Sequence, residues 1–369
     1  MRILLDYRPA LVERTGVGEY THEMARALAR LLPERDQLVL FSSSWKDRLE
    51  PGRVSGAAVI DVRVPVRVLN FVWHRLERPP VERFAGTVDV AHSSHPLLMP
   101  ARNAARLVTI YDLFFLADAA GTATEIRRDY PALTAAHARR ADAVVVISRY
   151  TASAVAAQLD VPADRLVLCP PGAPDWPRRD RLQPTGPILY LGSAERRKNV
   201  PGLLRAYARL RTLCPDAPRL ILAGRPPAAG SEMEAMLRAP DLAGHVEHRG
   251  YVDEAERRRL YAAASVLVVP SLDEGFGMPA LEAMTLGVPV VAANRGALPE
   301  VTGDAARLVD PEDDAGIAES MRLVLTDTDG TRVRVELGFA RAAAYSWRAS
   351  AARLLEAYQD LHARRQARA

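Results

Sequence analysis

Short, continuously apolar runs alternate with helix-like stretches along most of this chain. The runs are rich in Val, Ile and Leu and have the length typical of parallel strands that are buried on both faces. Between them, apolar residues recur every three or four positions, as on one side of a helix. This alternation predicts an α/β fold with parallel sheets. The runs are RILLD, QLVLF, AAVIDVR, RLVTIYD, DAVVVIS and RLVLCP, followed by PILYLG, RLILAG, SVLVVP, VPVVAA and ARLVD.

The alternating pattern occurs twice, and a segment rich in proline and glycine, residues 169–187, separates the two copies. Such a segment cannot hold a regular element, and we interpret it as an interdomain linker. The sequence therefore predicts two Rossmann-like domains, residues 1–175 and 186–346, that face each other across a cleft, with ligands outside the carboxyl ends of the strands. A final helix over residues 347–369 has its apolar face at Leu354, Leu355, Tyr358 and Leu361.

Composition and charge exclude several classes of protein. The net charge of the 369 residues is only +4, and basic and acidic residues are interspersed, which argues against a dedicated nucleic-acid binder. Cys169 and Cys214 make neither a disulfide framework nor a metal-ligand spacing, as expected in a reducing compartment. The apolar run at the N-terminus is too short for a signal peptide, and no run approaches the ~20 residues of a membrane span. We expect a cytoplasmic protein, and peripheral contact with the inner face of a membrane stays open.

One segment, DEGFGMPALEAM at residues 273–284, combines a glycine-containing loop with two carboxylates. It follows a strand-like run, and Pro279 suits the first position of a helix, so Glu274 lies in the loop and Glu282 in the helix. Gly275 and Gly277 let the backbone approach a ligand, and a helix start attracts phosphate. Either glutamate alone is explained as ordinary compensation of the helix dipole. The whole segment favours a site that binds a phosphate and sugar hydroxyls.

Two glutamates separated by seven residues resemble the signature of retaining glycosyltransferases of family 4, which have two facing Rossmann-like domains, the GT-B fold. TGVGEYTHEMARAL resembles the glycine loop and following helix of that family, and GSAERRKNVPGLLRAY resembles the segment that opens its second domain. HRGYVDEAERRRLYAAASVLVVPS and YSWRASAARLLEAY also fit, so the resemblance covers nearly the whole chain. It implies that the last helix completes the first, acceptor-binding domain and that the second domain binds the nucleotide sugar.

The resemblance also implies roles for individual residues. Glu282 would hold the nucleotide ribose, and Glu274 would contact the donor sugar. Lys198, with Arg197, would neutralise the diphosphate as it leaves, and fixed cations suit that developing charge. Ser193 stands where many relatives have an arginine, which leaves Arg197 to supply the second positive charge. The other residues expected in the donor site are Gly275, Phe276, Gly277, Met278, Leu281, Tyr251 and Val252.

In the first domain, Gly16 and Gly18 open a helix and resemble a turn that approaches phosphate, although G-x-G alone is weak evidence. A dinucleotide fingerprint would have glycine at position 21, where this chain has Thr21. Tyr111 and Asp112 stand where many relatives have His-Asp. A phenol does not titrate near neutrality. Two interpretations of Tyr111 are therefore equally favoured: a catalytic role, or packing beneath the donor.

Two further features of the first domain have alternative interpretations. His92 and His95 lack a third ligand at metal-binding spacing, and we expect them to be structural or to contact the acceptor. The segment VLNFVWHRLERPP, residues 68–80, mixes aromatic residues with arginines. It is either an interfacial helix or acceptor wall, or a helix packed on its own domain with its arginines in water.

The sequence therefore predicts a retaining glycosyltransferase that moves a hexose from a nucleotide-diphosphate sugar to a glycan, lipid-linked or small-molecule acceptor. LLDYRPAL, TGVGEYT and YDL resemble mannosyltransferase branches, so GDP-mannose is the first expectation for the donor and a UDP-sugar the alternative. No paired-aspartate motif is present, and we expect no metal cofactor. Two other classes stay open: a non-catalytic binder of nucleotide sugars, suggested by Tyr111, and an NAD(P)-dependent oxidoreductase, disfavoured by Thr21, Arg197 and Lys198.

Overall fold

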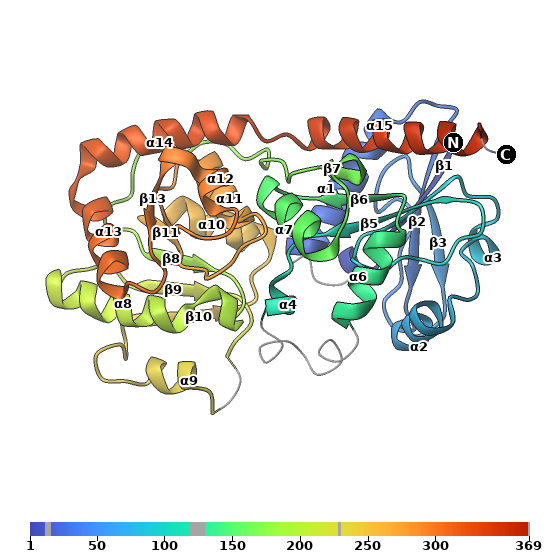
Figure 1. The fold of residues 1–369 in the computed structure, drawn as a ribbon. Coiled ribbons are helices and arrows are strands. Elements are labelled where there is room, and N and C mark those ends of the chain that lie inside the picture. The colour runs from blue at the N-terminus through green and yellow to red at the C-terminus, as the bar shows by residue number, and fades with distance from the viewer. Residues whose placement is uncertain (12–15, 118–129, 228–229, 368–369) are drawn as a thin grey trace. The chain divides into compact units, whose positions relative to one another are not determined.

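The structure is a computed structural model that describes residues 1–11, 16–117, 130–227 and 230–367 (Figure 1). The chain divides into two compact units. Unit 1 comprises Met1–Gly172 together with Ser346–Ala369, and unit 2 comprises Ala173–Tyr345. Each unit is built around one parallel sheet, so the predicted α/β class with two Rossmann-like domains is confirmed.

Unit 1 contains a seven-stranded sheet in the order β3-β2-β1-β4-β5-β6-β7, and every pair is parallel. Most strand residues are apolar because helices cover both faces of such a sheet. The strands are β1 Arg2–Asp6, β2 Gln37–Ser43, β3 Ala58–Val62, β4 Val90–Ser93, β5 Ala105–Ile110, β6 Ala143–Val146 and β7 Leu166–Leu168. The helical elements are η1 Arg8–Ala10, α1 Gly16–Leu31, α2 Val66–Phe71, η2 Val72–Leu76, α3 Glu82–Ala85, α4 Phe114–Ala117, α6 Tyr130–Arg140, α7 Arg149–Leu159, η3 Ala163–Arg165 and α15 Trp347–Gln366.

The last helix, α15, packs against α1 in unit 1, although the whole of unit 2 separates the two helices in sequence (Figure 1). Its apolar face buries Leu354 and Tyr358 completely. The hydroxyl of Tyr358 lies 2.5 Å from His92 Nδ1, and Ser350 Oγ donates to the carbonyl of Pro170 at 2.6 Å. The helix therefore forms part of the core of unit 1.

Unit 2 contains a six-stranded parallel sheet in the order β10-β9-β8-β11-β12-β13. A buried cluster lies between the sheet and the helices α8 and α13. The strands are β8 Ile188–Leu191, β9 Leu220–Ala223, β10 Val246–Gly250, β11 Val266–Val269, β12 Val290–Ala293 and β13 Ala306–Val309. The helical elements are η4 Arg196–Lys198, α8 Val200–Leu213, α9 Glu232–Leu237, α10 Glu254–Ala263, α11 Met278–Leu286, α12 Leu298–Thr302, η5 Gly303–Ala305, α13 Asp314–Thr326 and α14 Thr328–Ala343.

The proline-rich segment 169–187 contains no helix or strand, and most of it is bound to unit 2. The guanidinium of Arg179 donates to the carbonyls of Gly287 at 2.9 Å and Ala264 at 2.6 Å. A Cβ on Gly186 would lie 1.9 Å from the carbonyl oxygen of Ala263, so only glycine allows this approach. The segment is thus fixed along one side of unit 2.

Within the described ranges, no helix combines the length and the apolar character needed to cross a membrane.

Candidate active site

The loop and helix that follow β11 hold both glutamates of the predicted signature. Gly277 caps α11 with φ of 98°, and its neighbour Leu298 leaves no room for a Cβ at this position. Pro279 occupies the first turn of the helix, where a missing N–H costs nothing. Glu274 consequently lies in the loop and Glu282 in α11, both buried.

Asn199 ties the segment after β8 to the loop after β11. Its backbone is left-handed, with φ of 53°, which asparagine tolerates better than most residues. The side-chain amide donates to the carbonyls of Pro270 at 3.1 Å and Pro311 at 2.7 Å. In addition, the N–H of Leu272 donates to the carbonyl of Arg197 at 2.7 Å. These bonds hold η4, which carries Arg197 and Lys198, against the loop that carries Glu274.

Glu274 is the centre of an ion-pair cluster. Lys198 Nζ lies 2.5 Å from Glu274 Oε1, and Arg197 Nη1 lies 3.4 Å from Oε2. Ser271 Oγ donates to Oε1 at 2.9 Å. Burial alone would raise the pKa of Glu274, but the charges of Lys198 and Arg197 outweigh burial and bring the pKa below its usual value. The carboxylate is therefore ionised at neutral pH and orients the two cations.

Glu282 has partners from α10. The hydroxyl of Tyr261 donates to Glu282 Oε2 at 2.9 Å, and Arg257 Nη1 lies 3.4 Å from Oε1. Burial and the adjacent carboxylate of Glu282 raise the pKa of Tyr261 well above its ordinary value, so its hydroxyl remains a donor. The guanidinium of Arg257 lies over the ring of Trp176, which is 6.0 Å from the ring of Tyr261. These partners hold the Glu282 carboxylate in a fixed orientation.

The other residues expected in the donor site lie around this cluster in different ways. Phe276 and Leu281 have buried side chains, and the Phe276 ring meets the Tyr345 ring edge-on at 5.3 Å. If these two residues take part in the donor site, they would do so through their backbone rather than their buried side chains. Tyr251 is exposed and, with Val252, follows β10. Because all strands of the sheet are parallel, this position lies on the same sheet edge as Lys198 and Glu274.

In unit 1, Gly16 and Gly18 begin α1, and Gly18 is buried. Residues 12–15, which directly precede Gly16, lie outside the described residues. Tyr111 donates to the carbonyl of Ser94 at 3.2 Å, and burial raises its pKa, so the phenol stays neutral. Asp112 Oδ1 accepts from the N–H of Phe114 at 3.2 Å at the start of α4. Both side chains thus have structural partners within unit 1.

His92, within β4, and His95, shortly after that strand, differ in their surroundings. His92 is buried between Tyr358 and Thr109, and burial lowers its pKa to about 3. His95 Nδ1 accepts from the N–H of Leu97 at 3.1 Å, and its Nε2 lies 3.1 Å from the buried carboxylate of Asp6. Each histidine therefore has its polar partners within unit 1.

Sequence reasoning missed the residues that position the two glutamates. Ser271 and Asn199 fix Glu274 and its cations, while Tyr261 and Arg257 hold Glu282. The one available signal was the position of Asn199 directly after Arg197 and Lys198, since asparagine suits a left-handed turn. Among the described residues, no three His, Cys, Asp or Glu side chains gather in a way that would hold a metal ion.

Two parallel-sheet Rossmann-like units are the architecture of the GT-B glycosyltransferases. Two family models match the chain, "Glycosyltransferase Family 4" over residues 14–176 and "Glycosyl transferases group 1" over residues 186–327. The chain belongs to the family 4 glycosyltransferases of the GT-B fold.

Individual proteins are similar to the chain over nearly its full length. O-antigen chain mannosyltransferase B of Escherichia coli is 28% identical over 385 residues, covering 98% of this chain and 100% of that protein. Sucrose-phosphate synthase from Thermosynechococcus elongatus has a TM-score of 0.79 at 21% identity and covers 98% of this chain and 99% of its own. HepE of Anabaena, solved in complex with UDP and glucose, has a TM-score of 0.73 at 16% identity, covering 98% and 100%.

Proposed function

We propose that this glycosyltransferase is a retaining enzyme that transfers a hexose from a nucleotide-diphosphate sugar, with unit 2 binding the donor and unit 1 the acceptor. The observation that carries the proposal is the convergence of Lys198 and Arg197 on Glu274 at the start of α11. Two fixed cations beside a glycine loop and a helix N-terminus suit a diphosphate. The retention of configuration rests on the family resemblance.

In the proposed reaction, the bond between the anomeric carbon and the diphosphate oxygen breaks, and the acceptor oxygen bonds to the same carbon. The acceptor hydroxyl gives up its proton, and negative charge accumulates on the departing diphosphate. Lys198, Arg197 and the N–H groups at the start of α11 would stabilise that charge, which grows only as the bond breaks. Glu274 would orient the sugar, and Glu282 would bind the ribose hydroxyls.

GDP-mannose is the first candidate for the donor, and UDP-sugars are the second. The similarity to a protein named as an O-antigen chain mannosyltransferase supports mannose. The structural neighbour HepE, solved with UDP and glucose, supports a UDP-sugar as the second candidate. The acceptor is proposed to be a glycan or a lipid-linked saccharide.

Thermal unfolding with candidate ligands tests the donor class. GDP or UDP should raise the melting temperature, because a ligand that binds only the folded protein stabilises it by mass action. A shift produced by NAD or NADP, and by no nucleoside diphosphate, would contradict the proposal.

Turnover tests the chemistry. Release of the nucleoside diphosphate should depend on GDP-mannose or a UDP-sugar, and the anomeric configuration of the product, determined by NMR, should match that of the donor. An inverted configuration would remove the retaining assignment. Donor binding without any turnover over a panel of glycan and lipid-linked acceptors would identify a nucleotide-sugar binder instead.

A further inference from the structure

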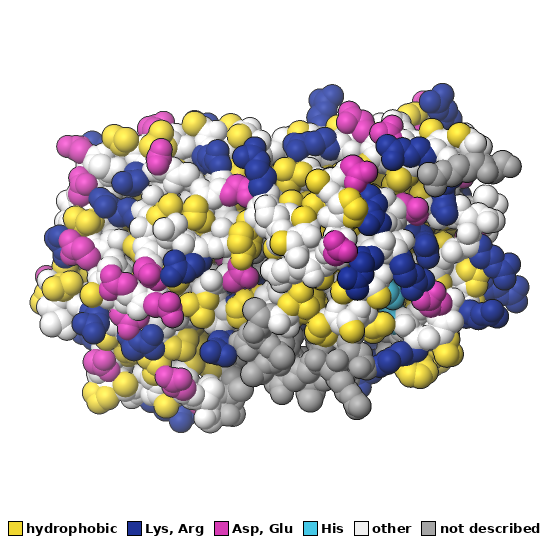
Figure 2. All heavy atoms as spheres, viewed as in Figure 1, with side chains coloured by type: hydrophobic (Ala, Val, Ile, Leu, Met, Phe, Trp, Pro, Cys, Tyr) yellow, Lys and Arg dark blue, Asp and Glu magenta, His cyan; other side chains and the backbone are white. Residues whose placement is uncertain are grey.

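The contacts that distinguish unit 2 lie in its interior, behind residues 274–277, which we call the donor loop. Over the elements of unit 2, Figure 2 shows Lys and Arg side chains interspersed with Asp and Glu, a mixed surface that suits water. Behind the donor loop, by contrast, the side chain of Phe276 is buried. Its ring meets the ring of Tyr345 edge-on, with 5.3 Å between the ring centres. The middle of the donor loop is therefore attached to a residue almost 70 positions further along the chain.

The segment that leads into α12 lies against both ends of the donor loop. The N–H of Ala297 donates to the carbonyl of Glu274 at 2.8 Å. A Cβ on Gly296 would lie 2.6 Å from the backbone nitrogen and oxygen of Glu274, and a Cβ on Gly277 would lie 2.6 Å from Leu298 Cδ2. Such close contacts mean that the donor loop follows the position of α12.

Tyr345 and Arg341 hold α12 in turn. The hydroxyl of Tyr345 donates to the carbonyl of Glu300 at 3.3 Å. Arg341 donates to the carbonyls of Glu300 and Val301, the latter at 2.9 Å, and its guanidinium lies 5.7 Å from the centre of the Tyr345 ring. Tyr345 thus reaches the donor loop by two routes, directly through Phe276 and indirectly through α12.

Tyr345 is also the last residue of unit 2. Its carbonyl accepts a hydrogen bond of 3.0 Å from the N–H of Ala173, the first residue of the same unit. In unit 1, a Cβ on Gly172 would lie 2.2 Å from the backbone nitrogen of Trp347, whose ring meets that of Tyr20 at 5.5 Å. Both chain connections between the units therefore leave unit 2 next to Tyr345.

We propose that Tyr345 is a positioning residue of the donor site, which holds the donor loop in the conformation that binds a diphosphate. Its ring fixes Phe276, and its hydroxyl fixes α12, so that the N–H groups of the loop are oriented before a ligand arrives. The two glycines of the loop give its backbone more freedom than other residues would, and a site on such a loop needs rigid support from its neighbours. The inference rests on the proposed binding of the donor by unit 2.

Hydrogen exchange measures the order of the donor loop without any ligand. In Tyr345→Leu, the backbone N–H groups of residues 275–278 should exchange roughly tenfold faster than in the wild type, because local opening becomes easier. Tyr345→Phe keeps the ring contact and loses only the hydroxyl, so it should restore most of the protection. The matched control is Tyr207→Leu, which alters a buried tyrosine in the cluster beside α8. That variant should lower the free energy of unfolding and leave exchange in the loop unchanged.

Calorimetric titration with GDP and UDP measures the effect on binding. Tyr345→Leu should raise the dissociation constant of the preferred nucleoside diphosphate by roughly three- to tenfold, the loss expected for an aromatic contact that acts through the loop. Tyr345→Phe should bind nearly as the wild type does. Trp347→Leu alters the next aromatic residue along the chain, on the unit 1 side, and should keep both the affinity and the exchange rate of the loop.

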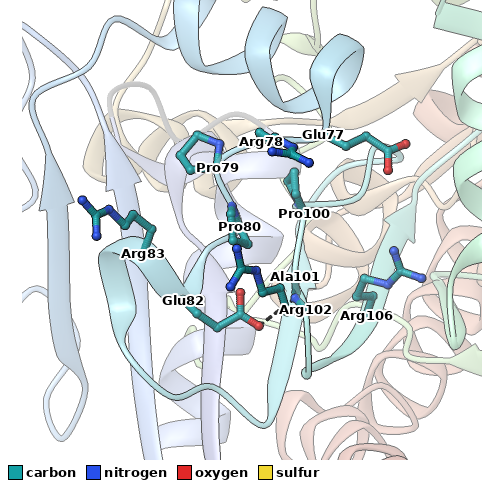
Figure 3. Close-up of a pocket in the computed structure, with 10 residues that line it drawn as sticks. All are labelled: Glu77, Arg78, Pro79, Pro80, Glu82, Arg83, Pro100, Ala101, Arg102 and Arg106. Atoms are coloured by element: carbon teal, nitrogen blue, oxygen red, sulfur yellow. Dashed lines mark hydrogen bonds between the residues drawn. The ribbon is translucent and has the colours of Figure 1, made fainter.

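A pocket of unit 1 provides a surface control. It has a volume of about 670 Å³, and Arg83, Arg102 and Arg106 are among the residues that line it (Figure 3). Arg106 lies at the start of β5, whereas Tyr111 follows the end of that strand, so the pocket lies toward the sheet edge away from Tyr111. Arg83→Ala/Arg102→Ala should therefore leave nucleotide affinity and loop exchange as in the wild type.

Two results would overturn the role of Tyr345. One is equal loss of affinity in Tyr345→Leu and Trp347→Leu, which would mean that any disturbance near the chain connections weakens binding. The other is loop exchange that is unchanged in Tyr345→Leu, or that rises equally in Tyr207→Leu. In either case the proposed function stands as long as the wild type binds GDP or UDP. A wild type that binds neither nucleotide would instead remove the proposed function, and with it the ligand that Tyr345 is proposed to serve.

Discussion

The hydroxyl of Tyr261 donates a 2.9 Å hydrogen bond to Glu282, so the proposed ribose-binding carboxylate is held by a neighbouring helix of the same unit. The same hydroxyl lies 3.1 Å from the carbonyl oxygen of Pro279, in the first turn of α11, which shares its single hydrogen with Glu282. Trp176, from the segment that leads into unit 2, packs against this tyrosine. Glu282 is therefore oriented before any ligand arrives, which reduces the entropy lost on binding.

Removal of that hydroxyl should weaken nucleotide binding. Tyr261→Phe removes a bond that orients Glu282 and does not itself reach the ligand. An indirect loss of about 0.5–1.5 kcal/mol should raise the dissociation constant for the preferred nucleoside diphosphate by roughly two- to tenfold. Tyr207→Phe is the matched control, because Tyr207 is also buried in unit 2 and donates to the carbonyl of Pro218 at 2.9 Å. Calorimetric titration should show unchanged affinity in the control. The same affinity loss in both variants would mean that Tyr261 acts only through general stability.

Glu282→Ala and Glu274→Ala should have different effects. A hydrogen bond to a charged group contributes about 1.5–3 kcal/mol, so Glu282→Ala should weaken nucleoside diphosphate binding by roughly ten- to a hundredfold. Glu274→Ala removes the negative charge that pairs with Lys198 and Arg197, so affinity for the nucleoside diphosphate should be kept or increased. Its turnover number should instead fall by roughly a hundredfold or more, because orientation of the sugar matters in the transition state. Calorimetry and turnover assays on both variants measure this, and parallel losses of affinity would contradict it.

Asn199 should contribute to stability through its left-handed backbone and to turnover through its side-chain hydrogen bonds. Asn199→Ala places a Cβ-bearing residue without a polar side chain at a φ of 53° and removes the bonds to Pro270 and Pro311. Asn199→Gly removes only the bonds, so it should be less destabilising by about 1 kcal/mol. Both variants should lose turnover because the position of Lys198 depends on this clamp. Asp160→Ala, at a φ of 56° in unit 1, should lose stability and keep turnover.

Unit 1 should lose stability as the pH falls below neutrality. Burial lowers the pKa of His92 to about 3, and His74 and His137 have pKa values of about 3 and 4, also mainly through burial. From about pH 6.5 down to about pH 4, the unfolded chain binds protons at these positions that the folded chain does not, so unfolding becomes easier. Each histidine contributes a slope of at most about 1.4 kcal/mol per pH unit. Urea unfolding at several pH values measures the slope of the unfolding free energy against pH. His92→Gln should reduce this slope by up to about 1.4 kcal/mol per pH unit, which corresponds to one proton. An unchanged slope would argue against a neutral His92.

Turnover should survive EDTA. The proposed diphosphate site has Lys198 and Arg197 as its positive charges, and these side chains would take the place of a divalent cation. The assay compares product formation in untreated and EDTA-treated protein, with Mg²⁺ or Mn²⁺ added back. Complete loss of activity that a metal restores would show that the protein cations are insufficient.

The sequence predicted the fold class because buried parallel strands leave long apolar runs, and it placed Glu274 in a loop and Glu282 in a helix because Pro279 marks the helix start. It did not predict that Tyr261 meets Glu282, because that contact depends on how α10 packs beside α11. Nor did it predict that the side chain of Phe276 is buried, because its packing against the ring of Tyr345 is a tertiary contact. Local rules act within one element, whereas these contacts depend on tertiary packing.

Helix α15 has a consequence for how the protein is made. It follows the whole of unit 2 in sequence, yet Tyr358 and Leu354 fill the core of unit 1. On the ribosome, unit 2 is a continuous stretch and can fold as soon as it emerges, while the earlier-synthesised unit 1 still lacks a helix. Unit 1 can therefore complete its core only after unit 2 has been synthesised, although the domain made first usually folds first. Until α15 is available, the residues that it covers in unit 1 lack their partners: His92, which contacts Tyr358, and Tyr20, whose ring meets that of Trp347 at 5.5 Å.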